Sequence, residues 1–177
     1  VGRSFAPRLL RAVHPWRPEA AALAAQLLTL ERRDILLEEL PGEIERFKHS
    51  TTHEVAYEIL LYSQRQSLHR DVARWYEVHQ ADGLSAHYPL LAHHYRGAEE
   101  PEQERRYARL AGEQAAAGYA NAEALRYIDR ALELAPAHDL PERYALLLTR
   151  ERVHALQGAR EPQLQDLEAL QGIADAQ

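Results

Sequence analysis

The sequence of 177 residues predicts a mainly α-helical fold that contains one small β-hairpin. Apolar residues recur at spacings of three and four along most of the chain, which is the period of an amphipathic helix. A single passage is strand-like, and it ends in a Pro-Gly pair that favours a tight turn. Apolar residues form 46% of the chain and charged residues 27%, the balance of a globular protein with a core.

Two helices are predicted at the start of the chain, over residues 4–13 and 18–33. Pro18 suits the first turn of the second helix, because proline has no N–H to leave unpaired there. An apolar stripe along the second helix indicates the face that is buried. The stripe consists of Ala21, Leu23, Ala24, Leu27, Leu28 and Leu30.

A β-hairpin and a further helical run are predicted after the first two helices. Strand-like residues at Ile35–Glu39 and Ile44–His49 flank the Pro-Gly turn. Helical spacing returns from about 51 to 79, and Ser63 is a candidate N-cap that divides this run into two helices. Helix, helix, hairpin and helix is the order of a winged-helix-like module, which we expect to occupy residues 1–80.

An antiparallel helical array is predicted for residues 84–177, after a linker at Ala81–Ser85. Short connections between helices of similar length imply antiparallel neighbours. The expected helices lie near residues 86–96, 101–118, 120–135, 141–157 and 161–174.

One pair of these helices matches the 34-residue tetratricopeptide pattern, which places small residues where two helices cross and a proline where the second must stop. The matching residues are Gly112, Ala124, Ile128, Ala131 and Pro136. The next pair matches more loosely, with Gly158 at its turn, Leu167 and Leu170 on its second helix, and Glu151 where glycine is usual. A generic helical bundle is the alternative to a tetratricopeptide-like array.

Composition excludes several classes of function. The net charge is −6, and neither half has the clustered basic residues that binding to nucleic acid requires. The chain has no cysteine, which excludes disulfides and thiolate metal sites. Its single lysine, Lys48, follows no glycine-rich loop, so a nucleotide-hydrolysing P-loop is absent.

The sequence also carries expectations about location and context. No stretch has the length and apolar character of a membrane span or signal peptide, so we expect a cytoplasmic protein. The chain contains no methionine, and we expect it to be part of a longer protein.

Three passages together resemble a known family. They are FKHSTTHEVAYEILLYSQRQSLHRDVARWYE at 47–77, LLAHHY at 90–95 and ANAEALRYIDRALEL at 120–134. They are similar to the region after the nucleotide-binding module of bacterial STAND-class signalling ATPases, including those attached to class III adenylyl or guanylyl cyclases and related transcriptional activators. The resemblance implies a winged helix and tetratricopeptide-type helices that couple the nucleotide state of an upstream ATPase core to a partner or inducer.

The resemblance also implies a nucleotide-sensing role for His49 and Lys48. In related ATPases a histidine at the end of a winged-helix strand contacts the bound diphosphate, and Phe47, Lys48 and His49 match that order. A ring N–H and a lysine charge both suit a phosphate oxygen. The alternative is a merely structural histidine. The expectation is that His49→Ala weakens ADP binding and alters the basal activity of a parent protein that contains the ATPase core.

Other candidate sites are weaker. His53 and Glu54 begin HEVAY, which lacks the second histidine of a zinc-protease motif. His87, His93 and His94 lack metal-ligand spacing, because the adjacent His93 and His94 should point apart, so we expect no metal site. Interspersed acidic residues around Arg65, His69, Arg70 and Arg74 favour a solvated helix face over a DNA-reading one.

The function predicted from the sequence is therefore that of a noncatalytic regulatory fragment with no cofactor. The helical array would bind a protein or peptide partner, as helical solenoids commonly do. Most of its tyrosines are expected to pack between helices, and lining of a concave groove is the alternative for some of them. A DNA-binding winged-helix regulator with a helical dimerisation tail is the alternative function. The five serines show no nucleophile-elbow context, so an enzyme is disfavoured.

Overall fold

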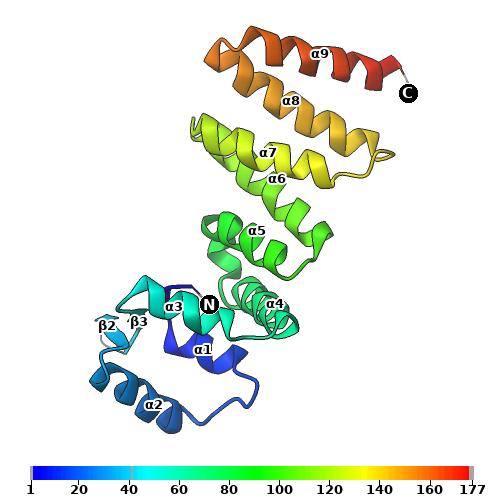
Figure 1. The fold of residues 1–177 in the computed structure, drawn as a ribbon. Helices are drawn as coiled ribbons and strands as arrows, with labels where there is room; N and C mark the ends of the chain where they lie inside the picture. Colours follow the sequence, from blue (N-terminus) through cyan, green and yellow to red (C-terminus); the bar gives the residue numbers. More distant parts are fainter. Residues whose placement is uncertain (1, 41, 176–177) are drawn as a thin grey trace. The chain divides into compact units, whose positions relative to one another are not determined.

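The computed structural model describes residues 2–40 and 42–175, which divide into two compact units at the Ala81–Asp82 boundary. Helices dominate both units, and every described strand belongs to the first unit (Figure 1). The predicted fold class, mainly α with a small β-hairpin followed by a helical array, is confirmed. No helix in the described ranges is both long enough and apolar enough to cross a bilayer.

The sheet of the first unit has three antiparallel strands in the order β1-β3-β2. Strands β2 (Leu36–Leu40) and β3 (Ile44–Phe47) form the predicted hairpin, with Leu36 opposite Phe47. Gly42 turns the chain with a φ of +69°, a conformation that glycine adopts without strain. The predicted turn residue Pro41 lies outside the described residues.

Strand β1 (Ser4–Phe5) corrects the expectation of a helix over 4–13, since helix α1 begins only at Pro7 (Pro7–Val13). The two residues of β1 pair with Arg46 and Glu45 of β3. This pairing joins residues far apart in sequence, so local periodicity carries no sign of it. Helix α2 (Ala20–Arg32) likewise begins after the expected first-turn residue Pro18, with Glu19 as its N-cap.

Two helices follow the sheet, α3 (Ser50–Glu58) and α4 (Tyr62–His79). The predicted division of this run is present, but Ser63 lies inside α4 and is not its N-cap. The N-cap is Leu61, whose N–H donates to the Gln64 side-chain Oε1 at 3.0 Å. The glutamine thereby satisfies a backbone donor that the start of a helix would otherwise leave unpaired.

Helix α1 contributes to two apolar clusters in the first unit. One joins Phe5, Leu23, Leu27 and Leu36, with Leu10 packed against it. The other joins Leu9 and Val13 of α1 to Val72 and Trp75 of α4, and so fixes α1 against the second half of α4. Burial of such side chains is the main force that holds these elements together.

The second unit begins within a 3₁₀ segment, η1 (Ala81–His87), whose first residue ends the first unit, and continues with helices that each pack on the next along the chain. The helices are α5 (Tyr88–Gly97), α6 (Pro101–Ala117), α7 (Asn121–Leu134), α8 (Leu140–Gln157) and α9 (Arg160–Asp175). Their bounds agree with the predicted helices to within about two residues. Figure 1 shows them stacked in chain order.

The residues that match the tetratricopeptide pattern lie where α6 and α7 cross. Ala124, Ile128 and Ala131 of α7 are fully buried, and Gly112 of α6 lies directly against Ile128. Pro136 follows the end of α7, whose C-cap is Ala135. The small residues therefore stand at the close approach of two helices, where a larger side chain would force them apart.

The pair α8 and α9 differs at its crossing. Glu151 occupies the position of Gly112, and its Oε1 accepts a 2.7 Å hydrogen bond from the Gln163 side-chain amide of α9. Leu170 is buried, whereas Leu167 is 44% exposed and contributes less to packing than the repeat pattern predicts. A polar contact thus replaces the close glycine contact of the first pair.

Three turns of the array share one backbone conformation. A residue with positive φ follows the last helical residue within one or two positions, at Glu99 (+55°), Tyr119 (+58°) and Gly158 (+68°). The next residue's N–H then reaches back to a carbonyl of the last turn, as Ala120 does to Ala115 at 2.9 Å. These are the bonds of a Schellman-type helix end. Gly118, expected at the second turn, is not the left-handed residue.

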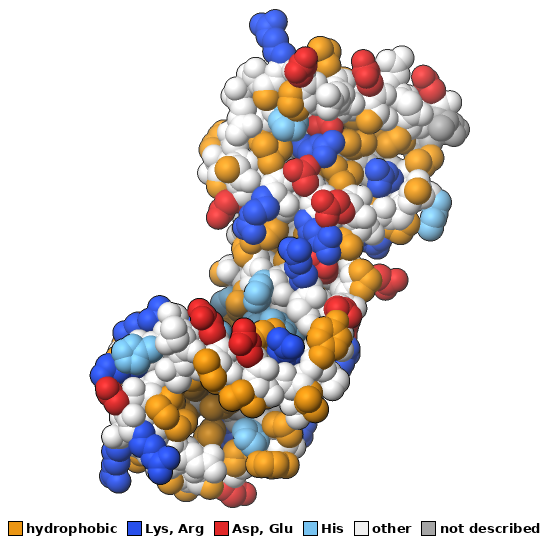
Figure 2. Space-filling view, viewed as in Figure 1, with side chains coloured by type: hydrophobic (Ala, Val, Ile, Leu, Met, Phe, Trp, Pro, Cys, Tyr) orange, Lys and Arg blue, Asp and Glu red, His pale blue; other side chains and the backbone are white. Residues whose placement is uncertain are grey.

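Ion pairs connect helices of the array, both neighbours along the chain and α6 with α8. Arg105 pairs with Glu142 at 3.2 Å, and Arg150 of α8 pairs with Asp129 of α7 at 2.7 Å and with Asp166 of α9 at 2.5 Å. Asp166 is 1% exposed, and the hydrogen bonds that Arg150 donates to it raise the pKa of the arginine. Figure 2 shows arginine and carboxylate side chains lying side by side on this unit.

Candidate functional site

A small pocket on the array is formed by the first three of its long helices. Its volume is about 160 Å³, enough for one side chain of a partner and less than a drug-sized ligand needs. The small side chains of Ala92 on α5 and Ala108 on α6 leave the space open. The other lining residues are Pro89, His93, Arg96, Glu104, Arg126, Tyr127 and Arg130.

Helical spacing brings the charged residues to this pocket. Arg126 and Arg130 are one turn apart on α7, and therefore project from the same face of that helix. Arg130 donates to both carboxylate oxygens of Glu104 on α6, at 2.7 and 3.1 Å. It also donates to Glu133 at 2.9 Å. These bonds, with that to Glu104 the strongest, raise the pKa of Arg130.

Arg130 thus neutralises the buried carboxylate of Glu104. This carboxylate therefore does not compensate the charges of Arg96 and Arg126. Among residues 2–40 and 42–175, neither Arg96 nor Arg126 makes an ion pair. The guanidinium of Arg126 lies 4.2 Å from the ring centroid of Tyr127, which orients it at the pocket. Three arginines against one carboxylate leave two positive charges there. Such an arrangement suits a carboxylate, which the arginine fork can bind through two oxygens.

Comparison with protein-family models, curated proteins and solved structures found no match to this chain. The site must therefore be interpreted from its own geometry. Sequence reasoning missed Arg96, Glu104, Arg126 and Arg130 as a group, because they come from three helices. The only local signal is the one-turn spacing of Arg126 and Arg130.

The predicted nucleotide-sensing residues lie in the first unit, where β3 leads into α3. Lys48 forms an ion pair with Asp34, so its charge already has a partner. Its backbone N–H donates to the carbonyl of Ile35 at 3.0 Å. His49 is the exposed N-cap residue of α3, and its side chain makes no capping hydrogen bond. A contact of His49 with a diphosphate stays a prediction from the resemblance.

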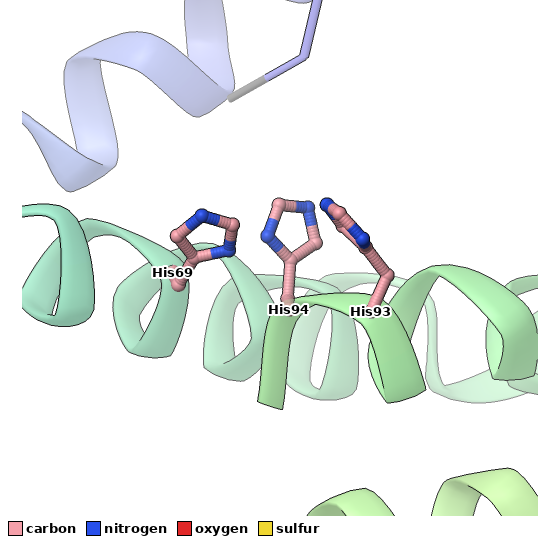
Figure 3. A group of neighbouring side chains, drawn as sticks. All are labelled: His69, His93 and His94. Atoms are coloured by element: carbon pink, nitrogen blue, oxygen red, sulfur yellow. The ribbon is translucent and has the colours of Figure 1, made fainter. Parts of the chain in front are cut away.

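The histidines of α5 lie closer together than the sequence suggests. The ring centroids of His93 and His94 are 5.3 Å apart (Figure 3), so the expectation that the two side chains point apart is wrong. The ring planes meet at 69°, edge to face, although the residues are adjacent on the helix. Two imidazoles are fewer than the three or four protein ligands of the usual zinc sites, so this pair alone assigns no metal.

Arg65 of α4 is held by a contact with α3. Arg65 lies over the ring of Tyr57 at 5.3 Å, and the hydroxyl of Tyr57 is 3.0 Å from Nε2 of the buried His69. These contacts tie α4 to α3. Helix α2, which directly precedes the hairpin, is rich in alanine and carries its one arginine, Arg32, in its last turn. The DNA-reading alternative stays a prediction from the sequence.

Proposed function

We propose that this chain is a noncatalytic regulatory module whose helical array binds an acidic segment of a protein partner. The observation that carries the proposal is the pocket between α5, α6 and α7, with Arg96 and Arg126 unpaired at its edge. The pocket's volume accepts one carboxylate side chain, and its aromatic and alanine walls accept the adjoining methylene groups. The array positions these groups on packed helices, so little ordering cost remains at binding.

The wider role rests on the resemblance described above. In that role the chain belongs to a larger STAND-class signalling ATPase and transmits nucleotide state from an upstream core to the partner-binding array. A Walker A and Walker B pair encoded directly upstream would support this part of the proposal, and an unrelated domain there would contradict it.

Partner binding can be tested with a fluorescein-labelled hexaglutamate peptide and fluorescence anisotropy at low ionic strength. We expect saturable binding that Arg126→Ala weakens about tenfold, since charge-assisted hydrogen bonds are lost. The matched control is Arg152→Ala, an exposed arginine of α8 that does not line the pocket. Equal binding of a hexaglutamine peptide, or equal weakening by the two variants, would contradict the proposal.

A further inference from the structure

A second and larger pocket lies within the first unit and is independent of the proposed function. It is bounded by α1, by the connector between α1 and α2, and by the second half of α4. Its volume is about 900 Å³, within the range of small-molecule sites. Six basic side chains line it, and they are Arg8, Arg11, Arg17, Arg74, His14 and His79.

The charge of this pocket is positive. The two carboxylates that line it, Glu19 and Asp71, oppose four arginines and leave two positive charges even with both histidines neutral. Over the described parts of the chain, none of the four arginines forms an ion pair or a side-chain hydrogen bond. Arg130 and Arg150 of the array, in contrast, bind carboxylates.

The walls of the pocket are held in place. Leu9 and Val13 of α1 pack on Val72 and Trp75 of α4, so the arginines of both helices project from a fixed core. Arg8 and Arg11 are one turn apart on α1. The guanidinium of Arg8 lies 5.7 Å from the Trp75 ring centroid, which directs it along the same wall.

The connector is also ordered. The N–H of Arg17 donates to the carbonyl of His14 at 3.0 Å, and the N–H of Trp16 donates to His14 Nδ1 at 3.2 Å. Because Nδ1 accepts, the proton of a neutral His14 ring is on Nε2, which remains a donor. Arg17 has a φ of +41°, a conformation that costs energy in a residue other than glycine and needs support from its surroundings.

His79 gives the opposite wall a defined orientation. Its Nδ1 donates to the carbonyl of Trp75 at 2.9 Å, and its ring stacks on the Trp75 ring with centroids 4.6 Å apart. The imidazole is therefore held flat against the indole, and both line the pocket together with Arg74.

We propose that this pocket binds a small anion that carries two or more phosphoryl groups. Guanidinium forks match phosphate oxygens in pairs, and four unpaired arginines on three segments exceed what a single monovalent anion requires. The concave shape and the volume favour a small molecule over duplex nucleic acid, which needs a cation stripe along an open surface. Helices α1 and α4 and the connector between α1 and α2 thus form a polyphosphate site in the first unit.

The test uses tripolyphosphate as the probe and the full chain as the protein. Trp75 lines the pocket and Trp16 lies in the connector, and these are the two tryptophans of the sequence. Tryptophan fluorescence should therefore change saturably on titration, with weaker binding of pyrophosphate and weaker still of monophosphate. Arg11→Gln and Arg74→Gln should each weaken binding about tenfold or more, and Arg11→Lys should weaken it less.

The matched control is Arg32→Gln, an exposed arginine of the same unit outside the pocket, which should change the affinity less than about twofold. Far-UV circular dichroism shows whether each variant is folded. Absence of a saturable signal at low ionic strength, or equal weakening by Arg32→Gln and Arg11→Gln, would overturn the proposal. So would binding to a DNA duplex, or to vesicles with phosphoinositide, that tripolyphosphate and soluble inositol trisphosphate fail to compete for.

Discussion

A β-carbon added to Gly112 would stand 2.7 Å from Cδ1 and 3.2 Å from the backbone nitrogen of Ile128. The side chain of Ile128 is fully buried, and its backbone cannot move without shifting α7 against α6. The contact therefore makes glycine a requirement of this helix crossing.

Gly112→Ala should lower the free energy of unfolding by about 1–3 kcal/mol, because overpacking outweighs the better helix propensity of alanine. Gly172→Ala is the matched control, since Gly172 lies in α9 with no atom within 4 Å of an added β-carbon. That control should be neutral or stabilise by up to about 1 kcal/mol. Urea unfolding followed by far-UV circular dichroism measures both, and a stable Gly112→Ala variant would contradict the packing argument.

Tyr119→Gly should stabilise the array by about 0.5–1 kcal/mol. Tyr119 has a φ of +58° and its side chain is 77% exposed, so glycine removes strain and little packing is lost. Gly158→Ala, at the equivalent left-handed position with open space around it, should destabilise by about 1 kcal/mol. Thermal unfolding of the two variants should shift in opposite directions, and a shift in the same direction would refute the shared turn geometry.

Asp166→Ala should destabilise the array by about 3 kcal/mol, because it leaves the partly buried Arg150 without its main partner. Asp175→Ala, at an exposed site at the end of α9, should change stability by less than about 0.5 kcal/mol. Chemical unfolding again gives the difference. A small effect of Asp166→Ala would mean that Asp129 alone satisfies Arg150.

The stability of the first unit should fall as pH rises. Burial, and the carboxylates of Glu31 and Glu38, raise the pKa of Glu45 from 4.5 to about 7. Arg8 and Arg11 of α1 line the same groove, about 420 Å³ in volume, without reversing this direction. The folded chain therefore binds the proton more tightly than the unfolded chain, and the associated stability, up to about 3 kcal/mol, is lost between about pH 4.5 and 7.

Unfolding at pH 5 and pH 8, followed by tryptophan fluorescence, measures this dependence, because both tryptophans belong to the first unit. Glu45→Gln should stabilise the protein at pH 8 and flatten the pH profile. Glu43→Gln, at an exposed site of the same hairpin, should leave the profile unchanged. A wild-type stability that rises from pH 5 to pH 8, with no effect of Glu45→Gln, would contradict the role of Glu45.

Local pattern was enough to predict the helices of the array, because each repeats its apolar residues over several turns and ends at a short connection. It was not enough for β1, whose two residues have no period of their own and are extended only through pairing with β3. The left-handed residue at Tyr119 was missed for a related reason, since the neighbouring Gly118 carries the usual sequence signal for such a turn.

The residues of the sites also differ in whether local sequence can identify them. Lys48 and His49 are adjacent, and a sequence motif can name them. Arg11 and Arg74 are separated by a hairpin and two helices, and only the packing of Leu9 against Val72 and Trp75 brings their helices together. No spacing rule within one segment would find such a pair.

The ion pair of Lys48 with Asp34 has a practical consequence, because Lys48 carries the only ε-amino group of the chain. A lysine-specific protease has a single cleavage site in this sequence, at the junction of β3 and α3. Acylating reagents likewise find one lysine, whose amine is paired with Asp34 in the folded chain. The rate of either reaction at this amine is therefore a direct readout of local opening of the hairpin.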